Sequence, residues 1–260
     1  MSTSGTANPR QRVLITGASS GIGEAFARHY AARNHDIVLV GRDIAALERV
    51  SLEITNMGVR AEIIVADLST PAGVEQVGAS AGVIDRVVAN AGITHAASIG
   101  TTDRDELDRL AYLMSTGVAR LCEIFVPGMM TRGHGSVVIV SSIASFTPMR
   151  KAAPYAASKS YATAYARSLA LEVQPKGIKV VAVCPGYVHT NLHERAGLDH
   201  LNRSVPSWMW LEPIDVVIAT ERALKRGRVV VVPGLVYRLV LPFLSSRIAQ
   251  GIWKRLTRRR

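Results

Sequence analysis

Short apolar runs alternate with longer segments of helical periodicity along most of this chain. The runs are continuous Val, Ile and Leu sequences rather than alternating apolar and polar residues, which indicates strands buried on both faces. Strands are predicted at 13–15, 36–40, 61–66, 86–89, 136–140, 179–183 and 228–232, and helices up to about 33 and at about 43–57, 103–130, 154–174 and 212–226. This alternation is typical of a doubly wound parallel sheet covered by helices, so we predict one α/β domain. The connection from 67 to 85 is poorly patterned, and no helix is predicted there.

The composition fits a globular protein that needs no disulfide bonds or bound metal to fold. The chain has 260 residues, of which 48% are hydrophobic and 20% charged, and this excludes a disordered protein. Cys122 and Cys184 lie far apart, which excludes a disulfide scaffold and cysteine-based zinc or iron–sulfur sites and is typical of a reducing, cytoplasmic compartment. The polar residues 1–10 contain no signal peptide pattern, and no run of about 20 apolar residues predicts a spanning helix.

The net charge of +11 is concentrated at the C-terminus. Residues 238–260 carry seven basic side chains and no acidic one, so the rest of the chain has a net charge of +4. The body shows no basic patch interleaved with aromatic residues, and we expect no nucleic-acid partner. Within this tail, apolar residues recur at i+4 spacing: Leu244, Ile248, Ile252 and Leu256. The resulting apolar face could lie on an anionic membrane surface, pack on the rest of the protein or a partner subunit, or end in solvent.

A glycine-rich sequence, Thr16 to Gly23, follows the first predicted strand and opens the first helix. Its G-x-x-x-G-x-G spacing allows a tight turn and lets backbone N–H groups approach a pyrophosphate at a helix N-terminus, as in a Rossmann-like dinucleotide site. A glycine-rich turn without ligand is the alternative. The same residues also match G-x-S-x-G, with Ser19 as the nucleophile of an α/β-hydrolase. That motif should follow several strands, so the dinucleotide interpretation is favoured.

The end of the second strand bears on which dinucleotide binds. An NAD site usually has an acidic residue there for the ribose 2′-hydroxyl, whereas an arginine suits a 2′-phosphate. Here Gly41 stands at the position expected to be acidic and Arg42 follows. Asp43 is either the N-cap of the next helix or a displaced 2′-hydroxyl ligand. The pattern favours NADP(H) over NAD(H).

Tyr155 and Lys159 share one face of a predicted helix at i, i+4 spacing. A tyrosine has a pKa of about 10, and a neighbouring ammonium favours its phenolate. Ser141 and Ser142 end the preceding strand, where an open parallel sheet places its ligands. Either hydroxyl can donate to a substrate carbonyl oxygen.

Taken together, these motifs resemble the short-chain dehydrogenase/reductase family over residues 11–233. The resemblance depends on segments in the family's order and spacing: Thr16–Gly23, Asp67-Leu68, Asn90-Ala91-Gly92, Ser142, Tyr155, Lys159 and Pro185-Gly186. The thirteen-residue interval to Tyr155 selects Ser142 over Ser141. Residues 11–233 would form the NAD(P)-binding catalytic domain and 234–260 a basic, apolar tail.

The resemblance implies an oxidoreductase that interconverts a carbonyl and a secondary alcohol. Tyr155 would be the general acid or base, Lys159 would hold the nicotinamide ribose and tune Tyr155, and Ser142 would orient the carbonyl. A homodimer or homotetramer is also implied. The expected cofactor residues are Gly17, Ser19, Ser20, Gly21, Ile22, Gly23, Arg42, Asp67, Leu68, Asn90, Ala91, Gly92, Tyr155, Lys159, Pro185, Gly186, Val188 and Thr190.

One departure from the family pattern concerns the proton route. The family usually has an asparagine three residues before Gly117, and this chain has Met114, which cannot hold a water in the same way. Turnover could be slow or the route altered, and a dinucleotide-binding sensor or scaffold without turnover is therefore the alternative function.

Three further features have mostly structural explanations. His189 and His193 are four residues apart, but no third ligand is evident, so no metal site is expected. Cys184 is expected to be a buried small hydrophobe. The segment 205–211 is either a helix packed on the core or an apolar substrate-pocket wall containing Trp208, Met209 and Trp210, which would suit an apolar or bulky substrate.

Overall fold

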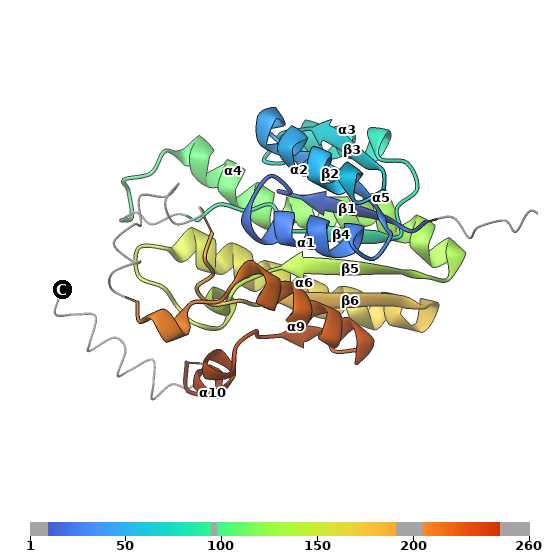
Figure 1. Ribbon diagram of the computed structural model, residues 1–260. Helices are drawn as coiled ribbons and strands as arrows, with labels where there is room; N and C mark the ends of the chain where they lie inside the picture. Colours follow the sequence, from blue (N-terminus) through green and yellow to red (C-terminus); the bar gives the residue numbers. More distant parts are fainter. Residues whose placement is uncertain (1–9, 95–97, 191–204, 245–260) are drawn as a thin grey trace, which may run out of the picture.

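Seven parallel strands form one sheet in the order β3-β2-β1-β4-β5-β6-β7. The computed structural model describes residues 10–94, 98–190 and 205–244 (Figure 1). The strands are β1 (Arg12–Thr16), β2 (Asp36–Gly41), β3 (Ala61–Val65), β4 (Arg86–Ala89), β5 (Gly135–Val140), β6 (Ile178–Val183) and β7 (Val230–Val231). The order reverses between β1 and β4, which makes this a doubly wound, Rossmann-like sheet and confirms the predicted fold class.

Helices cover both faces of the sheet. One layer contains α1 (Gly21–Ala31), α2 (Ile44–Asn56) and α9 (Pro213–Lys225), and the other contains α3 (Pro71–Ser80), α4 (Arg104–Met114), α5 (Thr116–Arg132) and α6 (Ala153–Val173) (Figure 1). Leu14 lies in the core beneath α5 and α6, whereas its neighbours Val13 and Ile15 lie in the core beneath α1 and α2. Side chains of successive strand residues point to opposite faces, so burial on both faces explains the continuous apolar runs.

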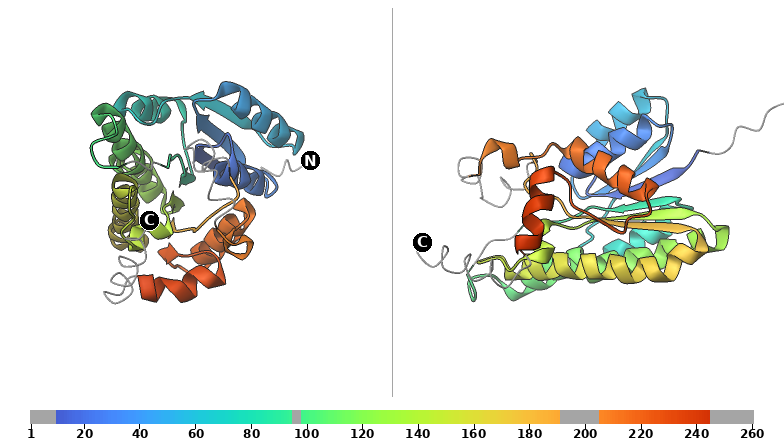
Figure 2. Two further views of the ribbon diagram at one scale, coloured as in Figure 1. Left: turned by 90° about the vertical axis from the view of Figure 1, so that its left-hand side faces the viewer. Right: turned by 90° about the horizontal axis from the view of Figure 1, so that it is seen from below.

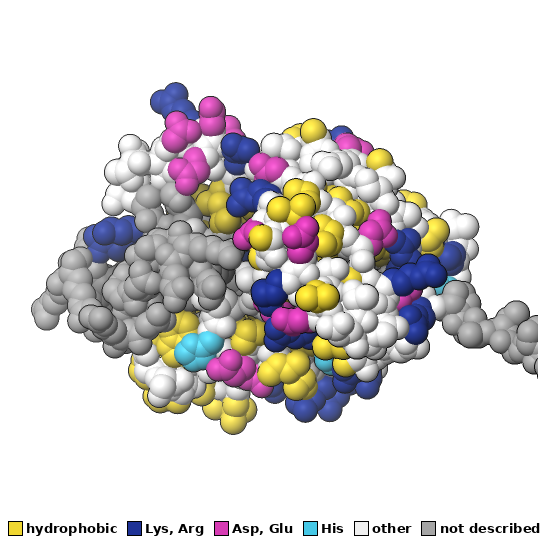
Figure 3. Space-filling model, turned by 45° about the horizontal axis from the view of Figure 1, so that its top comes forward, with side chains coloured by type: hydrophobic (Ala, Val, Ile, Leu, Met, Phe, Trp, Pro, Cys, Tyr) yellow, Lys and Arg dark blue, Asp and Glu magenta, His cyan; other side chains and the backbone are white. Residues whose placement is uncertain are grey.

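Charges of both signs cover the outer surface of α1 and α2. Arg28 and Arg49 bind Glu24 and Glu53 in a network with N–O distances of 2.6–3.2 Å. The space-filling view likewise shows acidic and basic side chains interspersed on this side of the molecule (Figure 3).

Two helices differ from the sequence prediction. The segment 67–85 contains α3, which begins with Pro71 and is capped by Thr70, whose hydroxyl accepts from Gly73 N at 3.1 Å. The single helix expected over 103–130 is divided at Ser115, whose backbone (φ −130°, ψ −91°) is not helical. Ser115 donates its hydroxyl to the Ala111 carbonyl, and a Cβ at Gly117 would lie 2.8 Å from the Tyr112 carbonyl oxygen, so the break requires a glycine there.

By length and composition, the stretch Arg104–Arg132 could also cross a membrane. It consists of α4 and α5, and 44% of its most apolar part is buried within the protein. Leu110, Leu121 and Phe125 of this stretch are buried. These two helices therefore serve as core helices of the domain.

Short helices gather at the carboxyl-terminal end of the sheet. They are η1 (Ile143–Phe146), η3 (Ser207–Met209) and α10 (Leu235–Leu244), while η2 (Gln174–Lys176) joins α6 to β6. Helix α10 contacts η1 and packs beside the turn that follows β6 (Figure 2). Residues 235–244 of the predicted tail thus form a helix on the domain, and residues 245–260, with most of the apolar i+4 face, lie outside the described residues.

Candidate active site

The two serines after β5 have different surroundings. Ser141 Oγ donates to the Lys159 carbonyl oxygen at 2.9 Å and lies 2.8 Å from Thr163 Oγ1, so this hydroxyl helps to pack α6 on the sheet. Ser142 caps η1, where its Oγ accepts from Ala144 N at 3.2 Å, and its side chain also makes a hydrogen bond with Tyr155. The structure therefore brings Ser142, and not Ser141, to the tyrosine.

Helix α6 carries Tyr155 and Lys159 one turn apart. Lys159 Nζ lies 5.8 Å from the centre of the Tyr155 ring and donates to the Val140 carbonyl at 2.9 Å. Further along α6, the small buried residues Ala162 and Ala166 let this helix approach the sheet closely. Ser142, Tyr155 and Lys159 thus converge where β5 ends.

Burial changes the proton affinity of both titrating groups. Burial lowers the pKa of Lys159 from 10.5 to about 8, while the nearby Cys184 thiol acts in the opposite direction. Burial raises the pKa of Tyr155, and the hydrogen bond with Ser142 opposes this change. Near neutral pH, the site therefore holds a protonated phenol next to a charged ammonium, which is the state of a general acid.

The glycines of the loop after β1 are required for two reasons. Gly17 and Gly21 have positive φ angles of 64° and 58°. A Cβ at Gly23 would lie 2.1 Å from the Gly17 carbonyl oxygen. Ser20 is the N-cap of α1 and its side chain makes no capping hydrogen bond, which leaves the first-turn N–H groups for an anion.

Asn90 holds the glycine loop against the end of β4. Its Nδ2 donates to the carbonyl oxygens of Thr16 and Gly17 at 2.9 and 3.1 Å. Thr16 Oγ1 accepts from the backbone N–H groups of Asn90 and Ala91, both at 2.9 Å. These bonds join β1 to β4 at the point where the strand order reverses.

Charged groups surround Asp67 beyond the end of β3. Arg109 of α4 binds its carboxylate at 2.9 Å. Burial would raise the pKa of Asp67, but hydrogen bonds from Ser69 and the positive charges of Arg42 and Arg109 lower it overall. Asp67 is therefore ionised at neutral pH, bound by Arg109 and within the electrostatic influence of Arg42. Asp43 accepts from Ala46 N at 3.1 Å and serves as the N-cap of α2.

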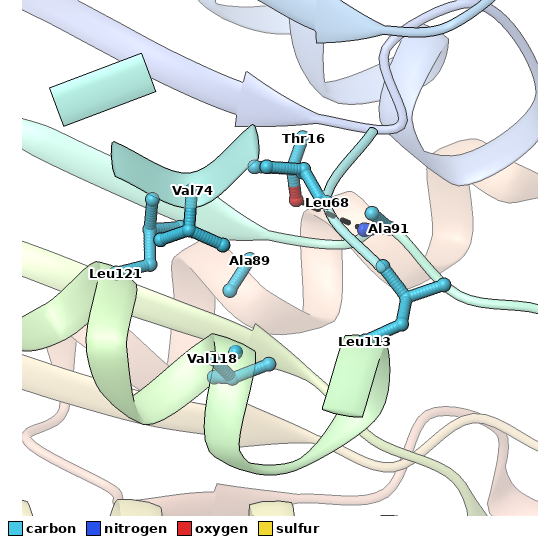
Figure 4. Close-up of a pocket in the computed structure, with 9 residues that line it drawn as sticks. Thr16, Leu68, Val74, Ala89, Ala91, Leu113, Val118 and Leu121 are labelled. Carbon is cyan, nitrogen blue, oxygen red and sulfur yellow. Dashed lines mark hydrogen bonds between the residues drawn. The ribbon is translucent and has the colours of Figure 1, made fainter. Parts of the chain in front are cut away.

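An apolar pocket lies next to this cluster, between the sheet and helices α4 and α5. It holds a cavity of about 10 Å³, which is room for one water at most. Its walls include the predicted cofactor residues Leu68 and Ala91 together with Leu113 and Val118 (Figure 4). The remaining lining residues are Thr16, Val74, Ala89, Gly117 and Leu121.

The turn after β6 lies across the glycine loop. Thr190 is so close to Gly21 that a Cβ there would lie 2.8 Å from Thr190 Cγ2. Val188 is buried and pairs with Leu211 in a parallel bridge. The Pro185–Thr190 segment and the phosphate loop thus form two sides of one site.

Comparisons with known proteins identify the family to which this site belongs. Residues 11–200 match the family described as short chain dehydrogenase. The chain belongs to this family. The mouse dehydrogenase/reductase SDR family member 7B is 31% identical over 192 residues, which cover 71% of this chain and 59% of the mouse protein. The match thus spans less than two thirds of that relative.

Solved structures agree with this membership in the short-chain dehydrogenase/reductase family. A short-chain dehydrogenase from Sphingobium yanoikuyae, solved with NADPH, is 30% identical, with a TM-score of 0.81 and 95% of each chain covered. The bulky-bulky ketone specific alcohol dehydrogenase from Comamonas testosteroni is 27% identical, with a TM-score of 0.78 and 88% of each chain covered. The family resemblance inferred from the motifs is confirmed.

Met114 is the clearest departure of this short-chain dehydrogenase from the family pattern. Its side chain is 1% exposed at the last turn of α4. A Cβ at Gly92 would lie 3.5 Å from both Met114 Sδ and Lys159 Nζ, so the thioether and the ammonium flank the same glycine. The methionine therefore presents sulfur and methylene groups to the lysine, where an amide could bind water.

Three side chains of the site were not found from the sequence. Arg49 donates to the Ser19 carbonyl at 3.3 Å and so ties α2 to the phosphate loop. Arg109 binds Asp67, and Tyr237 of α10 packs on Gly186. An arginine on a solvent-facing helix carries no local signal of such a contact. Tyr237 stands among apolar residues of the basic tail, whose periodicity indicated a helix face but not its partner.

His189, Tyr187 and Trp210 form an aromatic cluster beside the turn after β6. The His189 ring is stacked on the Trp210 ring, with the two ring centres 4.7 Å apart. The centre of the Tyr187 ring lies 5.4 Å from that of Trp210. His193 lies outside the described residues, and among 10–94, 98–190 and 205–244 no group of three metal-ligating side chains is close enough to hold an ion. Cys184 is fully buried, as expected. Trp208 is 64% exposed and lies in η3.

Proposed function

We propose that this protein is an NADPH-preferring oxidoreductase that interconverts a carbonyl and a secondary alcohol. The convergence of Ser142, Tyr155 and Lys159 at the end of β5 is the observation that carries the proposal. A glycine-rich phosphate loop lies at the same end of the sheet, so a dinucleotide and a proton donor would meet there. Members of this family use the same arrangement of residue types.

The chain's residues fit a nicotinamide dinucleotide. Gly17, Gly21 and Gly23 let the loop fold tightly, because a Cβ at each would lie 2.1–3.0 Å from neighbouring atoms of the chain. The first turn of α1 then offers N–H groups to the pyrophosphate. Leu68 and Ala91 present apolar surface for the adenine. When bound, the nicotinamide supplies or accepts the hydride.

The proton chemistry belongs to the chain itself. In the reductive direction, Tyr155 donates its phenolic proton to the carbonyl oxygen, and Ser142 donates a second hydrogen bond to the same oxygen. Lys159 remains charged below its pKa of about 8 and stabilises the phenolate that forms. Hydrogen bonds to the ribose hydroxyls would give the same ammonium a second role, in cofactor binding.

The preference for NADPH is supported by the charges around Asp67. Arg42 directly follows β2, where a 2′-phosphate would lie, and Gly41 leaves no carboxylate to repel it. The NADPH complex of the Sphingobium relative is consistent with this preference. Asp43 is occupied as a helix cap, which weakens its case as a ribose ligand.

A bulky, apolar carbonyl compound is the proposed substrate class. Trp210 and Tyr187 are in ring contact beside the turn after β6, and Trp208, two residues before Trp210, is exposed. Exposed aromatic side chains of this kind favour apolar ligands. The Comamonas relative is named for its specificity toward bulky ketones. These side chains therefore support substrates with apolar groups on both sides of the carbonyl.

A panel of ketones and alcohols of graded size, assayed with NADPH, NADH and their oxidised forms, tests the proposal. We expect turnover of bulky ketones with NADPH. Binding of NADPH without turnover of any compound would instead support a sensor or scaffold, for which buried Met114 beside Lys159 is the supporting observation. Ser142, Tyr155 and Lys159 are all present, and this favours the enzyme.

We further propose that the protein is cytoplasmic, that it forms a homodimer or homotetramer, and that its C-terminal tail contacts a membrane surface. Leu235 and Leu239 lie one turn apart on α10 and are 68% and 63% exposed. The sequence that follows is basic, which suits an anionic surface. Sedimentation with anionic and neutral vesicles, for the full chain and Leu239→Glu, tests the membrane contact, and light scattering gives the oligomeric state.

A further inference from the structure

Tyr237 connects the C-terminal helix to two segments of the site. It lies on α10 and is 4% exposed, within a small core that also contains Cys184 and Val232. Its ring covers Gly186 so closely that a Cβ there would lie 2.0 Å from Tyr237 Cζ. The turn after β6 can therefore adopt its position only with a glycine under this ring.

The hydroxyl of Tyr237 makes two hydrogen bonds to backbone groups. It accepts from Tyr187 N at 3.0 Å and donates to the Met209 carbonyl oxygen. Tyr187 follows directly after Pro185-Gly186, whereas Met209 belongs to η3. One phenol thus bridges two backbone segments that are 22 residues apart in the sequence.

The same two segments also pair with each other. Leu211 N donates to the Tyr187 carbonyl and His189 N donates to the Leu211 carbonyl, both at 2.9 Å. Residues 187–190 and 205–211 are separated by positions 191–204 in the sequence, so these hydrogen bonds join two described segments that are distant in the chain. Tyr237 adds a further link between these two segments from α10. Helix α10 also contacts η1, which begins directly after Ser142.

We propose that Tyr237 is a positioning residue for substrate binding. Its hydroxyl fixes the spacing between the turn that would border the nicotinamide and the η3 surface that would border the substrate. The proposal rests on the proposed function, because it assigns those two roles to the flanking segments. Loss of the hydroxyl releases Met209 and Tyr187 from each other, while the ring still covers Gly186.

Tyr237→Phe tests the proposal, with Tyr30→Phe as the matched control. Tyr30 is also a buried tyrosine with a hydrogen-bonded hydroxyl, which donates to Glu221 at 2.7 Å. It lies beside Arg86 at the start of β4, whereas Tyr237 lies by the turn that follows the end of β6. For Tyr237→Phe, we expect KM for a bulky ketone to rise about fivefold or more, the effect of one to two lost hydrogen bonds. The Kd of NADPH, measured by fluorescence, should change far less. Tyr30→Phe should leave KM unchanged even where it lowers the melting temperature.

Amide hydrogen exchange of the cofactor-free full chain gives a readout that needs no turnover. Exchange at Tyr187 and across 205–211 should be faster in Tyr237→Phe than in the parent and in Tyr30→Phe. Faster exchange with a raised KM supports the proposal. Unchanged exchange, or faster exchange with an unchanged KM, overturns it. If the parent turns over no ketone, the proposed function fails. The positioning role is then tested by calorimetry, which measures the affinity of Tyr237→Phe for the oxidised cofactor, the reduced cofactor and a bulky ketone. Affinities equal to those of the parent would overturn the positioning role.

Discussion

Replacing Lys159 by methionine should stabilise the cofactor-free protein while abolishing turnover. Lys159 is 6% exposed, and the difference between its ordinary pKa of 10.5 and about 8 in the fold corresponds to about 3 kcal/mol at neutral pH. Losing the hydrogen bond to the Val140 carbonyl costs about 1 kcal/mol. The free energy of unfolding should therefore rise by about 2 kcal/mol at pH 7.

The pH dependence of this difference follows from the direction of the pKa change. Below pH 8, Lys159 is charged in both the folded and the unfolded chain, so the parent bears the full cost of burying the charge. Between pH 8 and 10.5, the folded chain loses this proton before the unfolded chain does, and the parent becomes more stable. From pH 7 to 9.5, this gain amounts to about 2 kcal/mol, which Lys159→Met lacks. The stability difference between the two proteins should thus nearly vanish at pH 9.5.

Urea denaturation followed by far-ultraviolet circular dichroism, at pH 7 and pH 9.5 without cofactor, measures this difference. Comparing the two proteins at each pH cancels the contributions of their shared titrating groups to the free energy of unfolding. Lys179→Met is the control, because Lys179 is exposed on β6 and its removal should change little at either pH. A Lys159→Met variant that is no more stable than the parent at pH 7, or a difference independent of pH, would refute the reasoning.

Three further substitutions probe the chemistry and the cofactor. Tyr155→Phe should abolish turnover and leave NADPH affinity nearly intact, since the ring stays and only the transferable proton is lost; near-parent kcat would exclude the assigned mechanism. Arg42→Ala should weaken NADPH binding in fluorescence titration by about 1–3 kcal/mol and leave NADH binding unchanged, whereas equal parent affinities for the two cofactors would contradict the preference. Met114→Asn should lower the unfolding free energy by about 1–3 kcal/mol because an amide replaces a buried thioether, and should maintain or raise kcat; a lower kcat at an unchanged melting temperature would show that the methionine itself supports catalysis.

The local sequence determined the strands, the phosphate loop and the reactive pair. A strand buried on both faces has to be apolar at every position, so β1, β2, β5 and β6 are evident as continuous runs. Gly17, Gly21 and Gly23 are needed because the backbone itself makes the turn and the close contacts. Tyr155 and Lys159 are close because a helix brings i and i+4 together. These features depend on residues that are close together in the sequence, and they can therefore be predicted from it.

Only the tertiary structure decided which distant groups meet. The family spacing selected Ser142 over Ser141, but only the packing of α6 shows why: Ser141 turns toward Thr163 and Ser142 toward Tyr155. The break at Ser115 depends on how α4 and α5 fit the core. Arg109 reaches Asp67 across 42 residues, and Tyr237 reaches Gly186 across 51. Such contacts arise from the order of strands and helices in space, and the periodicity of the chain does not predict them.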